Sequence, residues 1–453
     1  MADGRSPLEA AQLAVQLARR AGAEQADAFA ASFIESEVTV RLGVVDRLLE
    51  AGSRSLGLRV IVAGRTAICS TADLSDAGLG RLATETVDLA RISAADEHAG
   101  LPDAGSLYRQ GMDALQLFDE RVAALTTDEK IRMALAGEGA ALAADKRISN
   151  SDGARLETVV GEVALANSLG FAGAYPLTSV SLMVEVMADD AGGKKRNAYW
   201  YSSERSLHRM QDPEEIGRIA ARRAVDQLGA RKMPTRKVAV VFEPLTAVSL
   251  LGNLAAAVSG AALYRRATFL AGRVGDRIGS DLVNVVDDGT LAGRAGSRPF
   301  DGEGVATCRN PLFQAGIFHG FLFDSYSARR SAAATTGSAS RGVASLPAPG
   351  PSNMVWAAGE RTPGDLLAGI EEGLYVTSLM GSGFNPTTGD YSRGAGGFWI
   401  ERGQLAYPVS EVNISGQFAQ MLADVDAVAD DLTWFGGMAA PTIRVREMTV
   451  SGE

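Results

Sequence analysis

The sequence predicts an α+β chain of two domains, in which antiparallel or mixed sheets are packed against helices. Segments with helical spacing of apolar residues alternate with runs of alternating apolar and polar residues, and glycine becomes more frequent in the C-terminal half. The chain has 453 residues, more than one compact core usually contains. We therefore expect an N-terminal α+β domain over residues 1–232 and a β-rich C-terminal domain over residues 233–453.

The first predicted element is an amphipathic helix over residues 7–20. Ser6 is a suitable N-cap, Pro7 takes the first helical position, and Gly22 can end the helix. Four strand segments separated by glycine turns follow. The strands are expected at residues 26–36, 37–49, 55–63 and 66–70, and the turns at Gly43, Gly52 and Gly64. Together these segments predict an antiparallel sheet.

Helices and strands continue to the end of the N-terminal half. The spacing predicts a helix over residues 75–92, a second strand region over 147–201 and a helix over 212–228. Asp212 is a suitable cap for the last of these helices. Residues 150–153, Asn-Ser-Asp-Gly, are typical of a hairpin turn within the strand region.

The C-terminal half is predicted to follow a basic, proline-containing link at residues 231–235. A buried strand is expected over 237–242, and helices over 245–260 and 363–372. The segment 331–351 is rich in Ser, Ala, Gly and Pro. It is either a mobile surface loop or an ordered cover over a groove, and the sequence leaves both open.

The composition argues against several classes of protein. A formal net charge of -10 is unfavourable for binding nucleic acid, whose phosphates attract basic surfaces. The two cysteines, Cys69 and Cys308, are too few for a disulfide scaffold. The N-terminal residues lack the apolar stretch of a signal peptide, and no run approaches the roughly 20 apolar residues of a membrane helix. We expect a soluble cytoplasmic protein that binds neither nucleic acid nor membrane.

The sequence offers few residues for a catalytic centre. A catalytic zinc usually takes three protein ligands, but His98, His208 and His319 are far apart and no His-Glu-x-x-His motif occurs. No serine has the Gly-x-Ser-x-Gly context of a nucleophile elbow. Cys308 and His319 are eleven positions apart on a predicted hairpin, so a cysteine nucleophile with a histidine base stays open as a hypothesis.

Carboxylates cluster in two places in the C-terminal half. They are Asp287 and Asp288, and then Asp424, Asp426, Asp430 and Asp431. The second group has the ligand type of a hard-cation site, but its spacing is not that of an EF-hand. We expect a solvated acidic loop there.

Several segments have an individual character that resembles one protein family. They are residues 264–270 (YRRATFL), 299–305 (PFDGEGV), 389–399 (GDYSRGAGGFW) and 407–411 (YPVSE). Together they resemble the PmbA (TldE) branch of the TldD/PmbA family, most densely over residues 234–452. The glycine-rich segment 389–399 is the most specific of them.

The resemblance implies a two-domain α+β chain that pairs with a TldD-like partner to cleave extended or unfolded peptides. The family's catalytic chains carry His-Glu-x-x-x-His on a helix and a cysteine ligand near the C-terminus. Here Gly252, Asn253 and Ala257 stand at the His, Glu and His positions, and residues 436–441 contain no thiol. The resemblance therefore implies that this chain holds no metal and that zinc is bound by the partner.

The leading hypothesis is thus a non-catalytic subunit with a groove for an extended peptide. Extended peptides are commonly bound by adding a strand to an open sheet edge. We expect Asp390, Tyr391, Ser392 and Arg393 to form a loop that lines this groove, with Arg393 holding a carboxylate in a bidentate pair. An equally open interpretation is that Asp390 and Arg393 only brace the loop.

Other interpretations remain open. The chain is alternatively a stand-alone, homodimeric peptide-binding or chaperone-like protein, or a hydrolase that uses Cys308 and His319. Homodimers are compatible with each of these hypotheses. Glu303 and Arg329 are minor candidates for the site and are expected to be structural.

Overall fold

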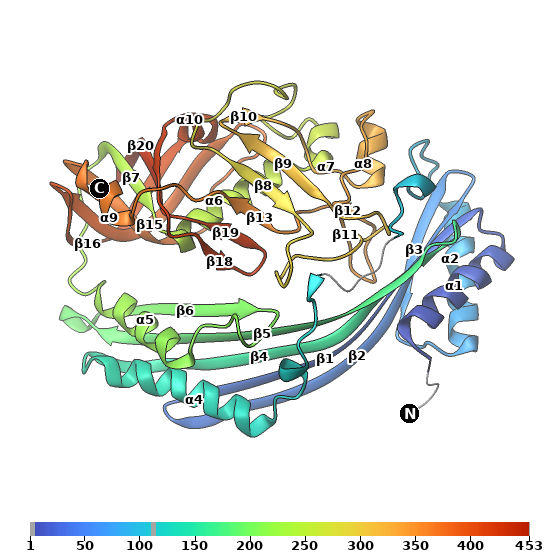
Figure 1. Cartoon of the computed structure of the whole chain (residues 1–453), viewed down its shortest axis with the longest axis horizontal. Helices are drawn as coiled ribbons and strands as arrows, with labels where there is room; N and C mark the ends of the chain where they lie inside the picture. The colour runs from blue at the N-terminus through green and yellow to red at the C-terminus, as the bar shows by residue number, and fades with distance from the viewer. Residues whose placement is uncertain (1–4, 110–114, 453) are drawn as a thin grey trace.

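A long, curved sheet of six strands forms the N-terminal layer of the computed structural model, which describes residues 5–109 and 115–452 (Figure 1). Every neighbouring pair of strands in it is antiparallel. In spatial order the strands are β3 (Arg65–Thr71), β2 (Val44–Val62), β1 (Gln25–Arg41), β4 (Ile148–Asn167), β5 (Ala172–Asp189) and β6 (Lys195–Glu204). β3 and β6 are therefore the two outer strands of this sheet.

Two pairs of helices cover the ends of this sheet. They are α1 (Pro7–Ala21) with α2 (Asp76–Ile92), and α4 (Thr127–Ala144) with α5 (Pro213–Val225). Short helical segments lie between them: η1 (Ala104–Ser106), α3 (Glu120–Ala123) and η3 (Ala191–Gly193). α1 begins with a capping box between Ser6 and Glu9 and ends at Gly22, whose φ of 104° suits glycine. The predicted helices over 7–20, 75–92 and 212–228 correspond to α1, α2 and α5.

The strands are longer than the sequence indicated. β1 runs without a break through residues 36 and 37, and Gly52 lies inside β2 opposite Ile34, so the predicted turn at Gly52 is wrong. β1 is paired on both sides, with β2 and β4, and these ladders keep it extended. The predicted hairpin turn at 150–153 is also wrong: these residues lie inside β4, where Gly153, at φ 111°, forms a bulge.

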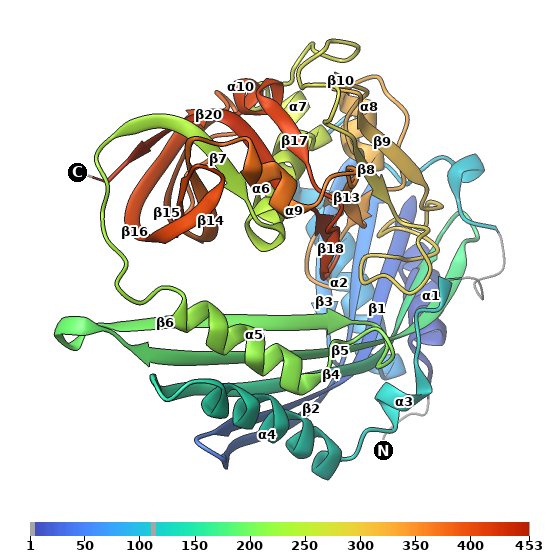
Figure 2. The ribbon, with the colours of Figure 1, turned by 60° about the vertical axis from the view of Figure 1, so that its left-hand side comes forward.

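The C-terminal half contains a closed sheet, seen curled above the N-terminal sheet in Figure 2. Its strands, in order, are β16 (Gln404–Gln417), β15 (Asp390–Glu401), β14 (Glu372–Met380), β7 (Arg236–Phe242), β20 (Ile443–Ser451) and β17 (Val425–Val428). Because β16 also pairs with β20, the first five strands close on themselves and both edges of β15 are occupied.

A second sheet and several short helices complete this half. The sheet contains, in order, β10 (Ile317–Phe318), β9 (Arg309–Gln314), β8 (Val285–Asp288), β13 (Met354–Trp356), β19 (Met438–Ala440) and β18 (Thr433–Phe435). The helices are α6 (Pro244–Ala257), α7 (Gly260–Tyr264), α8 (Ser325–Arg330), α9 (Pro363–Ala368) and α10 (Phe418–Ala423). α6 contributes Leu250, Leu251 and Leu254 to the large apolar core that joins both sheets. The architecture confirms the predicted α+β fold class.

Two predictions for this half need correction or completion. The helix expected over 363–372 ends at Ala368, with Gly369 as its C-cap, because the chain enters β14 at Glu372. The segment 331–351 is ordered in the structure: it contains the paired strands β11 (Ala339–Ser340) and β12 (Ala348–Pro349). It packs so closely on the N-terminal sheet that a Cβ on Gly57 would lie 1.7 Å from the Val343 carbonyl oxygen.

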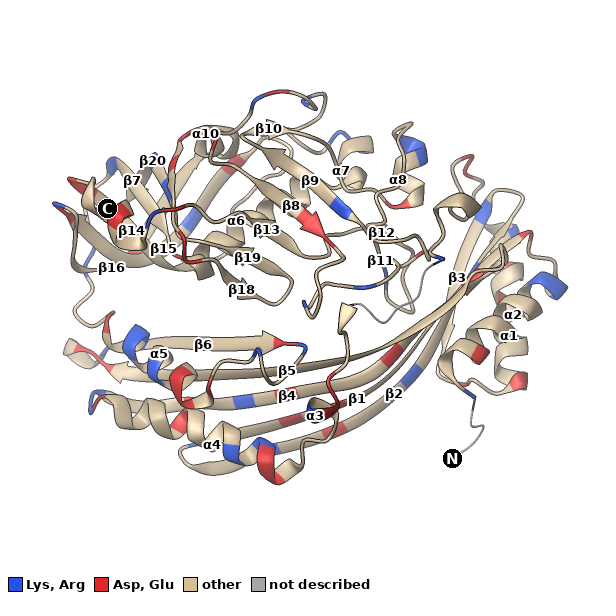
Figure 3. Ribbon diagram, viewed as in Figure 1, with Lys and Arg blue, Asp and Glu red and all other residues tan. Residues whose placement is uncertain are grey.

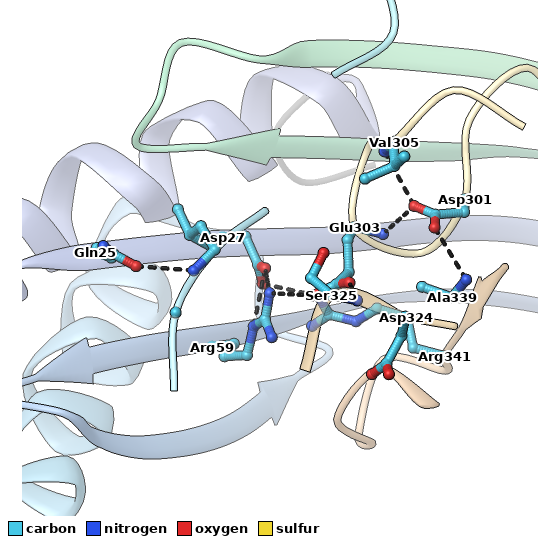
Figure 4. A network of polar contacts seen from close by, with 12 residues as sticks. Gln25, Asp27, Arg59, Asp301, Glu303, Val305, Asp324, Ser325, Ala339 and Arg341 are labelled. Carbon is cyan, nitrogen blue, oxygen red and sulfur yellow. Dashed lines mark hydrogen bonds and ion pairs between the residues drawn. The ribbon is translucent and has the colours of Figure 1, made fainter. Parts of the chain in front are cut away.

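Buried charges join the two halves of the chain (Figure 4). Arg59 of β2 pairs with Asp27 of β1 and with Glu303, 3.2 Å away in the C-terminal half. Arg341, whose side chain is fully buried, reaches Asp27 at 2.7 Å. We call Asp27, Arg59, Glu303 and Arg341 the domain clamp. Glu303 thus has the structural role expected of it.

Arg329 has a structural role as well. Its guanidinium donates hydrogen bonds to the carbonyl oxygens of His98, Gly100 and Leu101, at 2.7–3.1 Å. Next to it, the Tyr326 hydroxyl donates to Asp96 at 2.7 Å. The helix α8 is therefore fixed to the loop that follows α2 in the N-terminal half.

Charge is distributed over both halves. Figure 3 shows basic and acidic residues interspersed along α4, α5 and the strands, rather than separated by sign in this view. Among the helices of the described residues, none has both the length and the apolar character needed to cross a membrane.

Candidate functional site

A groove of about 940 Å³ lies between the N-terminal sheet and the closed sheet. One side consists of residues from β5, β6 and α5, and the other of residues from α6, β14, β15 and β16. Its volume is in the upper part of the range of ligand sites. Because the groove lies between the two sheets, an extended peptide can lie along it with one sheet on each side.

The outer strand β6 presents its edge to this groove. Residues 197–200 all line it, although successive side chains of a strand point to opposite faces. In the described part of the chain, β6 pairs with β5 alone. An outer strand carries main-chain N–H and C=O groups that can pair with a further strand. This edge is therefore the place in the groove where an extended peptide can add to a sheet.

Helix α6 forms part of the opposite wall. Leu245 and Ser249 are four residues apart and share one helical face, which lines the groove. The Thr246 hydroxyl donates to the Val376 carbonyl oxygen at 3.0 Å, which fixes α6 against β14. The next turn of this face contains Gly252, which is exposed. The helix that resembles the family's metal-binding helix thus extends from the groove.

None of the three positions of the degenerate metal motif has a His, Cys, Asp or Glu side chain. Gly252 has no atom within 4 Å of where a Cβ would be, whereas Ala257 is fully buried in the core. Between them, Asn253 contributes an amide whose Nδ2 is buried without a hydrogen-bond partner.

The neighbouring segment supplies no replacement ligand. α6 packs against β18 and β19, and β19 contributes only Met438, Ala439 and Ala440 there. Over residues 5–109 and 115–452, the structure contains no group of three His, Cys, Asp or Glu side chains arranged to hold a metal ion. A single amide does not provide the three ligands of a catalytic zinc, so the residues at this helix do not fit that metal.

An ion pair crosses from one wall of the groove to the other. Arg223 of α5 contacts Glu243, at the start of α6, through two hydrogen bonds of 2.9 and 2.5 Å. Arg223 also donates to the Thr377 carbonyl oxygen at 2.7 Å. Burial raises the pKa of Glu243, and Arg223 opposes that rise. This pair holds α5 against α6 and β14 and so sets the position of the two walls.

Arg393 contributes a cation to the groove that lacks a carboxylate partner. Its side chain is half-buried and lines the groove. Among the described residues no ion pair is formed by Arg393, and its Nε is buried without a hydrogen bond. The hydroxyl of Tyr391 is also buried without a partner; burial raises its pKa, and the nearby Arg393 opposes that rise. A ligand carboxylate would satisfy the guanidinium of Arg393.

The predicted loop 390–393 is instead the first part of strand β15. Arg393 shares a face with the buried Tyr391, and Asp390 and Ser392 point to the opposite, exposed face. Asp390 accepts a hydrogen bond from Thr388, at 2.6 Å, and Ser392 accepts one from Asn413, at 2.9 Å. Of these four residues, Arg393 lines the groove, Tyr391 is buried, and Asp390 and Ser392 accept hydrogen bonds from other residues of the chain. The functional role of all four stays a prediction.

The cysteine–histidine pair does not form. The register of β9 and β10 places His319 beside Leu312, and Cys308 instead contacts Asn310 and the Thr336 carbonyl oxygen, at 3.4 Å each. Burial, with a contribution from the charge of Asp287, raises the pKa of the Cys308 thiol. A nucleophilic cysteine needs a lowered pKa, so this geometry does not support the hydrolase hypothesis.

The other titratable candidates have protein partners in separate places. His98 lies 3.7 Å from Glu97, and His208 contacts Arg121. The expected acidic loop is wrong for Asp426, which lies in β17 and pairs with Arg444 at 2.7 Å. Asp287 and Asp288 lie in β8 and are buried.

Sequence reasoning missed the parts of the groove that depend on topology. The alternation of residues 195–204 is compatible with a strand, but it does not show that β6 is the outer strand of its sheet. The Arg223–Glu243 pair joins the last helix of one half to the first helix of the next. The only indication of this pair in the sequence is Glu243, an acidic residue directly before Pro244 at the start of a predicted helix.

Comparison with known proteins gives a consistent result along the chain. A family model described as PmbA/TldA metallopeptidase domain 1 matches residues 26–90, and the model of the central domain matches residues 120–228. The model of the PmbA/TldA metallopeptidase C-terminal domain matches residues 235–452. The last match begins next to the link predicted at residues 231–235.

Individual relatives cover nearly the whole chain. The chain is 34% identical to metalloprotease PmbA of Escherichia coli O157:H7, over 92% of this chain and 90% of that protein. It is 26% identical to a metalloprotease TldD homologue of Haemophilus influenzae, over 72% of this chain and 73% of that protein.

Solved structures show the same fold. One is a Bacteroides thetaiotaomicron protein described as a proposed modulator of DNA gyrase, with a TM-score of 0.91, 30% identity and 98% of each chain covered. Another is TldE of Thermococcus kodakarensis, with a TM-score of 0.88 and 22% identity, covering 98% of this chain and all of that one.

Proposed function

We propose, from the premise that this chain belongs to the PmbA/TldD metallopeptidase family, that it is a non-catalytic, peptide-holding subunit of a TldD/TldE-type metallopeptidase complex. The observation that carries the proposal is that α6 lines a groove suited to a peptide and yet has no metal ligands at its motif positions. The groove lined by α6 offers the outer strand β6 and a guanidinium, that of Arg393, which forms no ion pair within the described residues, whereas the metal positions of α6 are Gly252, Asn253 and Ala257.

The groove suits a peptide of any sequence. Main-chain hydrogen bonds to the edge of β6 depend on the peptide backbone and not on its side chains. The apolar residues of the groove, such as Trp200, Met380 and Phe398, provide surface for side chains of the peptide. Arg393 then fixes one carboxylate, either the peptide's C-terminus or an acidic side chain, and so sets where the bound chain ends or bends.

Hydrolysis is assigned to a partner chain. In the proposed complex, the His-Glu-x-x-x-His motif of a TldD-like subunit would hold zinc, which would supply an activated water molecule as the nucleophile. This chain contributes binding, orientation and one wall of the enclosure. Pairing with such a partner and a cytoplasmic location are parts of the same proposal.

Reconstitution tests the proposal. The purified chain, a TldD-like chain from the same organism and their mixture are assayed for cleavage of unfolded casein, with and without a chelator. We expect cleavage by the mixture alone, and its loss on addition of the chelator. An Arg393→Ala variant should lower cleavage by the mixture, whereas Arg309→Ala, which removes an exposed arginine of β9 away from the groove, should not.

Other outcomes of this experiment contradict the proposal. If the isolated chain binds casein-derived peptides, self-associates and never stimulates a TldD-like chain, the protein is a stand-alone peptide-binding protein. If the isolated chain cleaves casein without a partner, the assignment of catalysis to the partner is wrong.

A further inference from the structure

A second pocket, of about 460 Å³, lies on the other side of the molecule's domain junction, next to the domain clamp. Its lining includes Arg59 and Thr66 of the N-terminal sheet and Tyr264, Asp324 and Tyr326 of the C-terminal half, with residues 346–349 of the ordered segment as a cover. None of these residues lines the groove. The volume is within the range of small-molecule sites.

Arg59 presents an unused hydrogen-bond donor to this pocket. Its Nε and Nη2 donate to Asp27, and Nη2 also donates to Glu303 at 3.2 Å. Within the described residues, Nη1 of Arg59 has no partner. Arg59 is 5% exposed and lines the pocket, and its ion pairs with Asp27 and Glu303 hold its guanidinium in place.

Asp324 presents an unused acceptor to the same space. Its Oδ1 accepts hydrogen bonds from the main-chain N–H and the hydroxyl of Ser327, which caps α8. No partner is found for its Oδ2 in the part of the chain that the structure describes. Asp324 is 1% exposed, and burial raises the pKa of its carboxyl group. A cation bound at Oδ2 would offset the free-energy cost of burying the charged carboxylate.

The two charges face one space without pairing to each other. Arg59 forms its ion pairs with Asp27 and Glu303, and Asp324 lies beside that group in Figure 4. A ligand between them must therefore offer a cation to Asp324 and an anion to Arg59. Such opposite charges separated by one carbon atom are the feature of an α-amino acid in its zwitterionic form.

Part of the remaining wall, which also contains Asp96 and Arg265, suits an apolar or aromatic side chain. Tyr264 and Tyr326 meet edge to face, with ring centroids 5.9 Å apart. Leu346, Pro347 and Pro349 cover the pocket from the ordered segment, and Leu346 is 48% exposed. Aromatic and proline surfaces of this kind favour a side chain with little polar surface.

We propose that this pocket binds a free α-amino acid with an apolar or aromatic side chain, its carboxylate on Arg59 and its ammonium group on Asp324. The inference does not depend on the proposed function of the groove. A protein that takes part in peptide breakdown would meet such molecules as products.

Calorimetric titration of the full chain tests the proposal. L-phenylalanine and L-leucine are compared with N-acetyl-L-phenylalanine, which lacks the ammonium group, and with L-phenylalaninamide, which lacks the carboxylate. We expect the free amino acids to bind and each capped form to bind at least about tenfold more weakly, because each loses one charge-assisted hydrogen bond.

Variants separate this site from the groove. Asp324→Asn keeps the oxygen that caps α8, because Asn and Asp are equivalent N-caps. It removes the negative charge, so the affinity for L-phenylalanine should fall at least about tenfold. Arg393→Ala should leave this binding unchanged.

The proposal is overturned if neither free amino acid binds at concentrations up to about 10 mM. Equal affinity for the free and capped forms, or unchanged affinity in Asp324→Asn, would also overturn it. If Asp324→Asn does not fold, as judged by circular dichroism, the comparison of free and capped ligands on the natural chain still decides.

Discussion

At the scale of single residues, Arg393 is the side chain on which peptide binding depends most directly. Its guanidinium lines the groove and forms no ion pair with any residue that the structure describes, and its Nε is buried without a partner there. Such a group loses its hydration without full compensation in the free protein. A ligand carboxylate that pairs with Arg393 would therefore gain more binding free energy than a carboxylate that pairs with an exposed arginine.

Replacing Arg393 should weaken the proposed complex's action on peptides. Arg393→Ala removes a charge-assisted hydrogen bond of about 1.5–3 kcal/mol, which corresponds to a loss of about ten- to a hundredfold in kcat/KM for the reconstituted pair. Steady-state cleavage of a fluorogenic peptide checks this value. Arg393→Lys should recover only part of the activity, because lysine lacks the planar fork of arginine. Equal activity in all three proteins would refute the role.

The domain clamp should control stability rather than activity. In Arg341→Ala, Asp27 keeps Arg59 but loses a fully buried partner at 2.7 Å. Breaking a buried pair from one side costs about 3–5 kcal/mol, to be measured as a lower urea midpoint. Arg309→Ala is a suitable control, since its pair with Asp288 is long, at 3.9 Å, and exposed on the arginine side; it should cost less than about 1 kcal/mol.

Two buried aspartates predict opposite dependences of stability on pH. Burial alone would raise the pKa of Asp27, but Arg341 and Arg59 outweigh it, so the folded-state pKa lies below the ordinary 3.8. Its contribution to stability is present above that ordinary value and is lost as the pH falls through the folded-state pKa. Burial raises the pKa of Asp287 to about 7. For this group, stability decreases as the pH rises from about 4 to about 7.

Asp287→Asn checks the second of these dependences. The asparagine cannot ionise, so the free energy of unfolding should fall less between pH 4 and pH 7 in the variant than in the natural chain. Urea unfolding at several pH values measures the difference. An identical pH profile for the two proteins would show that Asp287 does not titrate in this interval.

At the scale of elements, the outer strand β6 is the feature that makes the groove a peptide site. Adding a strand to its edge should slow hydrogen exchange of the main-chain amides at residues 197–200. Exchange followed by mass spectrometry, with and without an extended peptide, checks this. The opposite outer strand, β3, is an internal control whose exchange should not change. Protection of both edges or of neither would contradict the assignment.

The sequence predicted individual elements well where local chemistry determines them. The N-cap Ser6, the N-cap Asp212 and the buried apolar run before Pro244 all identify their elements correctly. Its errors arose where pairing between strands overrides local signals. Gly52 and residues 150–153 resemble turns, but Gly52 pairs with β1 and residues 150–153 pair with β5, and this pairing keeps both segments extended.

The candidate site was only partly accessible from the sequence, for the same reason. The segment around Arg393 was identified by its resemblance to a family, but its glycines indicated a loop, whereas strands on both sides make it β15. Its alternation then determines that Arg393 and not Ser392 faces the groove. The edge of β6 and the clamp depend on contacts between segments more than a hundred residues apart, such as Arg341 with Asp27, which no local pattern shows.

At the scale of the whole molecule, the N-terminal sheet and the closed sheet enclose a groove, and buried charges join the two halves of the chain. The Arg223–Glu243 pair holds one end of the junction, and the clamp with Arg329 holds the other. The groove therefore has a set width before any peptide binds. A preformed site of this kind lowers the ordering cost of binding, which suits a subunit that presents substrates to a partner.

The most direct test of this account is the metal content and peptidase activity of the isolated chain. The purified protein is equilibrated with zinc, freed of unbound metal by gel filtration, and examined by mass spectrometry for metal and by casein cleavage. We predict far less than one zinc per chain and no cleavage that a chelator can abolish. One firmly bound zinc per chain, together with chelator-sensitive cleavage lost on changing Asn253, would contradict it.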